Sequence, residues 1–131
     1  MAGSYFTTYF LDTVIDHNLR GEDWTPPTAL YAQKHLGDPT DAGTAFPSTT
    51  TTREAVTLAA AAGGATVLAS TDVNWLSTVR EQVTHLSIWD AETGGHCIAI
   101  IELEESINAG IGDTIDLSSL PISFRAAEDA A

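Results

Sequence analysis

Four histidines are the side chains of this sequence best suited to bind a metal ion or to transfer a proton near neutral pH. They are His17, His35, His85 and His96. The last two lie on the arms of a predicted β-hairpin, in whose expected register His96 faces Trp89. His85 then faces about Ile100, so the two imidazoles are about four residues apart along the ladder, or roughly 13 Å at about 3.3 Å per residue. One zinc ion holds its ligands at about 2 Å, so we expect ordinary strand histidines and no metal site.

Carboxylate pairs are the second chemical feature of the sequence. Asp90 and Glu92 form one pair, and Asp113 and Asp116 form another. A hydrolase would need two carboxyl groups about 5 to 9 Å apart across a cleft, and Asp90, Glu92 and Asp113 are the candidates for that alternative. Both pairs lie in or beside predicted turns, where Asp caps backbone amides for local reasons. Motifs typical of catalysis or of phosphate, zinc and calcium binding are absent, so we expect no enzyme, no catalytic residues and no cofactor.

One cysteine and three tryptophans complete the chemically interesting side chains. Cys97 lies within an apolar strand pattern, which predicts a buried, inert thiol. Trp24, Trp75 and Trp89 could line a face on which sugar rings stack, with carboxylates binding the hydroxyls. Tryptophans in a β-rich domain are more often core and interface anchors. Sugar binding on such a face is therefore an alternative.

A β-hairpin is the element that must position most of these residues. Residues 82–90 and 96–101 favour β-structure, and residues 91–95 between them end in two glycines, a pattern typical of a hairpin. In the first arm Leu86 falls on one face and Val83 on the other, and both arms carry apolar groups on both faces. We therefore expect the hairpin to be central and covered on each side.

A helix is predicted over residues 5–20, with Ser4 as its N-cap and Gly21 as its stop. Its apolar side chains recur at spacings of three and four residues and form one stripe. The stripe consists of Phe10, Leu11, Val14, Ile15 and Leu19. One amphipathic helix cannot bury its own stripe, so we expect it to lie on the sheet or against another subunit.

Short β-favouring runs separated by Gly, Pro and Asp turns make up the rest of the chain. We expect strands or extended segments near residues 28–32, 53–59, 66–68, 72–78, 115–117 and 120–124, with turns at 38–44 and 106–113. The predicted fold class is mainly β, an antiparallel β-sandwich or barrel with one N-terminal α-helix. Residues 1–125 should form a single domain, and residues 126–131 a flexible tail.

The charge of the chain argues against some classes of partner. Eighteen acidic residues face only five Lys and Arg, which gives a formal charge of −13. Such a surface repels phosphates, so we expect no nucleic-acid binding. No apolar run reaches the roughly 18 residues of a membrane span, and the N-terminus lacks the basic region of a signal peptide. We expect protein partners and no membrane.

Several segments carry a resemblance to a known family. They are residues 10–19, 24–31, 38–44, 53–58, 83–95 and 108–114. Their order and spacing over residues 9–124 resemble small tailed-phage virion proteins of the actinobacteriophage tail fibre protein family. The chain departs from that pattern at residues 48–52, where a Gly-rich, Tyr-containing stretch is expected, and around residues 75–80, which look longer. The resemblance implies a virion structural role without enzymatic activity.

These observations favour a non-enzymatic virion protein, located on the capsid surface rather than on the tail. We expect a capsid decoration (cement) protein, a homotrimer that contacts itself and the major capsid protein or tail proteins. Interfaces of this kind bury about 800 Å² per partner. The alternative is a tail-fibre or tail-tip component that binds host surface glycan. The interface candidates are Phe10, Val14, Trp24, Tyr31, His85, Trp89, Ile98 and Ile100.

Overall fold

The computed structural model describes residues 5–48, 51–57, 60, 66–67, 74–76, 79–112, 114–116 and 123–124. Along the chain these residues form one helix and nine strands. The elements are β1 (Tyr5–Phe6), α1 (Thr8–Arg20), β2 (Leu30–His35), β3 (Glu54–Val56), β4 (Thr66–Val67), β5 (Asn74–Leu76), β6 (Glu81–Trp89), β7 (Cys97–Ala109), β8 (Thr114–Asp116) and β9 (Ser123–Phe124). Residues 126–131, the predicted tail, lie outside the described residues.

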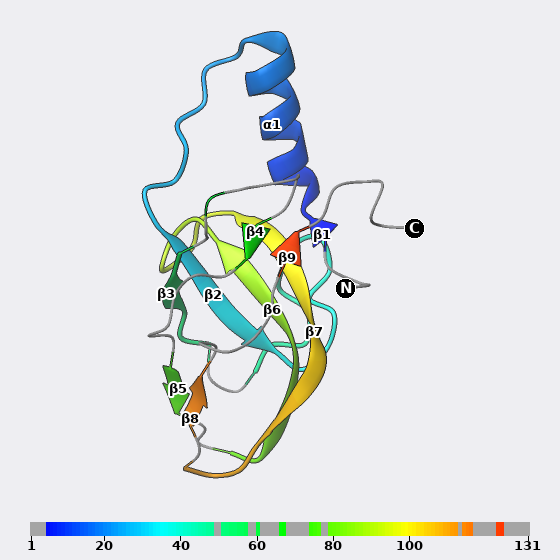
Figure 1. The fold of residues 1–131 in the computed structure, drawn as a ribbon, viewed down its shortest axis with the longest axis vertical. Helices are drawn as coiled ribbons and strands as arrows, with labels where there is room; N and C mark the ends of the chain where they lie inside the picture. The colour runs from blue at the N-terminus through cyan, green and yellow to red at the C-terminus, as the bar shows by residue number, and fades with distance from the viewer. Residues whose placement is uncertain are drawn as a thin grey trace.

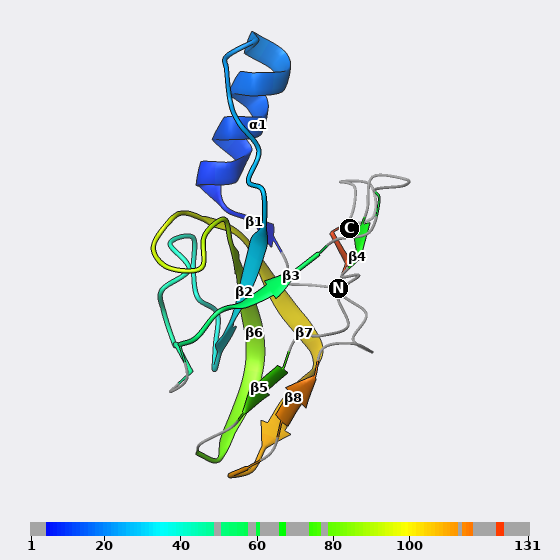
Figure 2. The same cartoon turned by 90° about the vertical axis from the view of Figure 1, so that its left-hand side faces the viewer.

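A five-stranded antiparallel sheet in the order β1-β7-β6-β2-β3 forms the body of the molecule (Figure 1). Two short antiparallel ribbons, β4–β9 and β5–β8, lie outside this sheet (Figure 2). The prediction of a mainly β, antiparallel fold with an N-terminal helix is confirmed. In the part of the chain that the structure describes, no helix is long and apolar enough to cross a membrane.

The predicted hairpin is present as β6 and β7 and lies in the interior of the sheet, as expected. Its register differs from the prediction, because Trp89 pairs with Cys97 and His85 pairs with Glu102. The ladder shifts between Val83 and His85 and again between Ile88 and Trp89. Each bulge reverses the alternation of side chains between the faces. The predicted turn at 106–113 is also wrong in part, since β7 continues to Ala109.

The bulges decide which apolar residues share a core. Val83, predicted to face away from Leu86, lies in the same cluster of buried residues as Leu86 and Ile88. That main cluster also contains Ala32, Val56, Ile98, Ala99, Ile101 and Leu103. A smaller cluster of Trp89, Cys97 and Ile100 lies against Tyr5. The apolar residues of the hairpin are thus divided between two cores rather than by simple alternation.

The helix α1 projects from one end of the sheet, and the chain returns beside it towards β2 (Figures 1 and 2). It begins at Thr8 rather than at residue 5, because Tyr5–Phe6 pair with β7 as β1. The N-cap is Thr7, whose hydroxyl accepts from the Phe10 N–H, whereas Ser4 lies outside the described residues. Gly21 ends the helix in a left-handed conformation with φ of 74°, as predicted.

Candidate functional site

The first candidate site is an apolar surface on α1 that the rest of the chain leaves uncovered. No residue of α1 is buried. Leu11, Ile15 and Leu19 follow one another at four-residue spacing and are 45%, 47% and 79% exposed. We call these three residues the α1 stripe. The structure divides the predicted stripe of the helix: Phe10 packs against the main core cluster of the sheet, whereas the α1 stripe is exposed.

The base of α1 is held firmly by hydrogen bonds to the sheet and to a loop. The Thr7 hydroxyl donates to the Cys97 carbonyl at 2.7 Å, and the Thr8 N–H donates to the Asp41 carboxylate at 2.7 Å. The Tyr5 hydroxyl donates to the Asp38 carboxylate at 2.7 Å. Burial and this hydrogen bond raise the pKa of Tyr5, while the Thr40 N–H and the Tyr5 hydroxyl lower the pKa of Asp38. The N-terminal end of the helix is therefore fixed to the sheet and to this loop.

A second face of α1 is covered by the returning chain. The Phe10 and Trp24 rings meet edge-on with centroids 6.3 Å apart, and His17 contacts Trp24 with a centroid distance of 5.9 Å. The interface candidates Phe10, Val14 and Trp24 are therefore half-buried. The most exposed apolar residues of the helix are instead Ile15 and Leu19. The sequence pattern alone does not show which side of the helix the returning chain covers and which side stays exposed.

The remaining interface candidates lie in the sheet. Trp89, Ile98 and Ile100 are 7%, 6% and 0% exposed, so the single chain already buries them. Tyr31 is half-buried and pairs with Trp89. His85 is half-buried, with its Nε2 atom 3.8 Å from a Glu102 carboxylate oxygen. The apolar patterns of the two arms are thus satisfied largely within the chain.

A buried serine and histidine form an arrangement that resembles a catalytic pair. His35 Nδ1 donates to the Ala45 carbonyl at 2.9 Å, so His35 Nε2 must accept from the Ser87 hydroxyl at 2.7 Å. The indole N–H of Trp89 donates to the same hydroxyl at 2.7 Å. His35 and Ser87 are both 0% exposed. Burial lowers the pKa of His35, and this relay is a packed part of the core that no substrate can reach.

The other predicted chemical groups have local structural roles. The Asp90 carboxylate accepts from the His96 N–H at 2.7 Å and so closes the hairpin loop, as expected of a turn aspartate. The His96 ring stacks on Tyr9 with centroids 4.0 Å apart. Asp113 lies outside the described residues, and within them no group of three potential metal ligands occurs.

Cys97 is buried, as predicted. It is 6% exposed, and its thiol donates to the Ala99 carbonyl at 3.7 Å. Burial raises the pKa of this thiol to about 12. Since the thiolate is the reactive form of cysteine, Cys97 is an inert part of the smaller core cluster.

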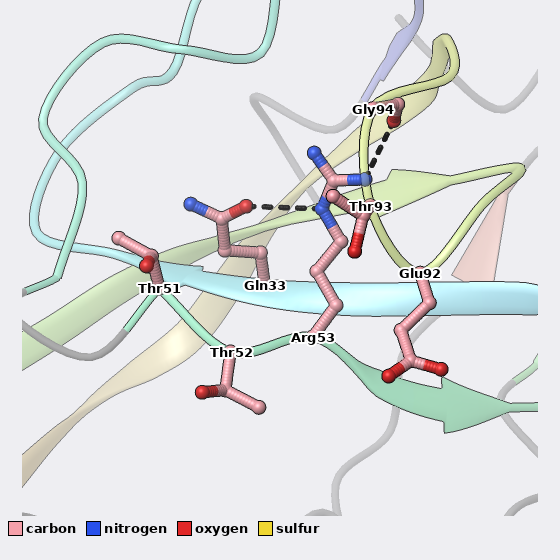
Figure 3. A pocket seen from close by; sticks show the side chains of 7 residues that line it. All are labelled: Gln33, Thr51, Thr52, Arg53, Glu92, Thr93 and Gly94. Carbon is pink, nitrogen blue, oxygen red and sulfur yellow. Dashed lines mark hydrogen bonds between the residues drawn. The ribbon is translucent and has the colours of Figure 1, made fainter.

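The second candidate site is a polar pocket of about 440 Å³ at the hairpin loop (Figure 3). Three segments line it: Gln33 of β2, residues 51–53 before β3, and residues 92–94 of the loop. Arg53 is its central side chain, and its guanidinium carbon lies 3.8 Å from the centroid of the Trp89 ring. We call this site the Arg53 pocket. Sequence reasoning did not find it, because the three segments are far apart in the chain.

The Arg53 pocket also changes the expectation for a tryptophan-lined sugar face. Trp89 is buried beneath Arg53, and Trp24 packs against Phe10 and His17. The side chain of Trp75 is outside the described part of the structure. A buried indole cannot stack on a sugar ring, so Trp89 does not take part in the sugar-binding face that was the alternative, and its burial agrees with the core anchor that we expected.

The family comparison can now be set beside this geometry. The model of the podophage GP4 fiber I protein gp80 family matches residues 5–125. The chain belongs to this family of phage fibre proteins. A search of the curated proteins finds no match. The resemblance to phage tail fibre proteins is confirmed, and membership of a fibre family implies a structural protein of the virion.

Proposed function

We propose that this gp80-family protein is a non-enzymatic structural component of a phage tail fibre. The observation that carries the proposal is the family match, which spans residues 5–125 of 131. It supports the tail-fibre alternative of the sequence analysis better than the capsid decoration protein. The buried state of the Ser87–His35 pair and of the Cys97 thiol agrees with a role that requires no catalysis.

The partner proposed for the α1 stripe is α1 of further copies of the same chain, in a homotrimer. An isolated helix shorter than about 12 to 15 residues is marginal in water, and α1 has 13 residues. Its base is fixed by the sheet, whereas the exposed side chains Ile15 and Leu19 lie on its outer turns. Packing these turns against other copies would bury apolar area at about 25 cal/mol per Å².

Charge bears on how this assembly would behave in solution. The formal charge of −13 makes the chains repel one another. Salt screens that repulsion but leaves apolar contacts intact. The proposed association should therefore strengthen as the salt concentration rises. An assembly held by ion pairs would weaken instead.

The experiment that tests the fibre assignment is labelling of intact particles with an antibody against this protein, followed by electron microscopy. We expect label at the tail and none on the capsid faces. Label spread over the capsid faces would reject the tail-fibre assignment and favour a decoration protein. The sedimentation mass of the isolated chain tests the trimer separately, and a monomer at high salt and high protein concentration would exclude it.

A further inference from the structure

The Arg53 pocket has the size of a small-molecule site and is lined by hydrogen-bonding side chains. Pockets that bind small molecules usually have volumes of about 300 to 1,000 Å³ and a few convergent polar groups, and this one measures about 440 Å³. Its lining residues are Gln33, Thr51, Thr52, Arg53, Glu92, Thr93 and Gly94. The side chains that line the pocket are thus polar or charged, with both donors and acceptors among them.

Gln33 is the most informative of these side chains. It is 8% exposed, and its amide oxygen accepts a hydrogen bond from Arg53 Nε at 3.2 Å. Because Arg53 can only donate, the oxygen must face the guanidinium and the amide nitrogen must face the other way. Figure 3 shows that nitrogen on the side towards Thr51. It donates to no residue that the structure describes, although a buried polar group is normally paired.

The Arg53 guanidinium is fixed in place by several contacts, and its Nη2 group remains available as a donor to a ligand. Its Nη1 atom donates to the carbonyls of Ala91 and Gly94 at 2.8 Å and 2.7 Å. These bonds and the contact with Trp89 fix the plane of the guanidinium. The Nη2 group makes no hydrogen bond within the described residues. A donor that is already immobilised loses little conformational entropy when a ligand binds.

We propose that the Arg53 pocket binds one neutral saccharide unit. Arg53 Nη2 and the Gln33 amide can donate to sugar hydroxyl oxygens, and the carboxylate of Glu92 can accept from a neighbouring hydroxyl. An anionic ligand is disfavoured by Glu92 and by the formal charge of −13, and a cationic ligand is disfavoured by Arg53. A neutral molecule with adjacent donors and acceptors satisfies all three groups. The proposal rests on the proposed fibre function for its biological role.

The affinity of a single pocket should be low. The lining residues include no aromatic side chain, and Trp89 is covered by Arg53, so a sugar ring gains hydrogen bonds without stacking. We therefore expect a Kd in the millimolar range, about −4 kcal/mol on the standard scale. Several copies in one fibre would raise the overall avidity by about 10²-fold or more.

Saturation-transfer NMR on the full-length protein tests the proposal. The probes are the methyl glycosides of glucose, galactose, mannose and N-acetylglucosamine at roughly 10 mM, a concentration suited to millimolar affinity, with methyl galacturonide as the anionic comparison. We expect transfer to at least one neutral glycoside and weaker transfer to the galacturonide. Glu92→Gln should weaken neutral binding about fivefold, because a charged acceptor becomes a neutral one. Thr93→Val, which removes one hydroxyl, should also weaken it.

Glu22→Gln is the matched control, since Glu22 is an exposed carboxylate near the end of α1. It should leave binding unchanged. Absence of transfer to every neutral probe, preference for the galacturonide, or equal binding by wild type, Glu92→Gln and Thr93→Val would each overturn the proposal. Because this experiment uses the isolated chain, its failure is distinct from failure of the fibre assignment, which is tested on particles.

Discussion

The central strands and α1 carry similarly clear apolar patterns and use them in opposite ways. In β6, Val83, Leu86 and Ile88 are at most 1% exposed. In α1, no residue is buried, and Leu19 is 79% exposed. An apolar pattern shows that a surface needs a partner, but it does not show whether that partner belongs to the same chain. In this protein the strands find it within the chain, and the outer turns of the helix do not.

The reason for the difference lies in the attachment of each element. The strand β6 has hydrogen-bonded neighbours on both sides, β7 and β2. The helix is attached through its N-terminal end, by Thr7 and Thr8. At about 1.5 Å per residue its 13 residues extend about 20 Å, so its outer turns pass beyond the end of the sheet (Figure 1). Four predictions test this contrast between a sheet whose apolar residues are buried within the chain and a helix whose outer apolar residues are exposed.

The largest effect should come from breaking the ion pair buried in the sheet. Lys34 Nζ lies 3.4 Å from the Glu81 carboxylate, and the two side chains are 0% and 5% exposed. Glu81→Gln should lower the free energy of unfolding by about 3–5 kcal/mol, because it removes a carboxylate that contacts a buried ammonium. Urea denaturation measures this change.

The matched pair on α1 joins Arg20 and Asp16 at 3.0 Å, with side chains 61% and 49% exposed. Asp16→Asn should cost only about 0.3–0.5 kcal/mol, since water screens the charges. Equal effects of the two substitutions would show that the sheet and the helix do not differ in the way the structure implies.

Two glycines with nearly the same φ angle give the next contrast. Gly21, at the end of α1, has φ of 74° and open space where a Cβ would lie, so Gly21→Ala should cost about 1 kcal/mol. Gly43 has φ of 75°, but a Cβ there would lie 2.6 Å from Cys97 Sγ and 3.0 Å from Trp89. Gly43→Ala should cost about 2–4 kcal/mol in a urea titration. If Gly21→Ala and Gly43→Ala lowered the free energy of unfolding by similar amounts, the loop around Gly43 would be able to move away from the core.

The pH dependence of stability should report on His35. Burial lowers its pKa in the folded state, so between that value and the unfolded pKa of about 6.5 the unfolded chain binds more protons. Stability should therefore fall as the pH drops below about 6.5, by up to about 1.4 kcal/mol per unit. His35→Gln should remove this part of the pH dependence. Thermal unfolding of both proteins between neutral and mildly acidic pH measures it, and parallel curves would contradict the prediction.

The smallest effect on stability is expected at Leu19. This residue also gives the most direct test of whether the α1 stripe is a contact between copies. Leu19→Gln should change the free energy of unfolding of the monomer by less than about 0.5 kcal/mol, because the side chain is 79% exposed. It should nevertheless weaken self-association, measured by sedimentation. Ile111→Gln is the matched control, since Ile111 is 76% exposed in the turn after β7, away from α1. If both variants associate like the wild type, the α1 stripe is not the contact between copies.

Sequence reasoning reached the features that depend on neighbours in the chain. The two glycines at 94–95 mark the hairpin loop, Gly21 marks the end of α1, and the apolar run around Cys97 marks a buried strand. Each is a local preference of backbone or side chain, so it can be recognised without the fold. The start of α1 was missed because Tyr5–Phe6 are drawn into the sheet by β7, about 95 residues further along the chain.

The sequence by itself determined the class of the protein: a mainly β fold with one amphipathic helix, in a family of phage fibre proteins. Only the tertiary structure decided the register of β6 and β7, the exposure of the α1 stripe and the existence of the Arg53 pocket. The bulge near Val83 and the gathering of Gln33, Arg53 and Glu92 follow from pairing between distant segments. Such pairing is chosen by the packing energy of the whole chain, which no local pattern contains.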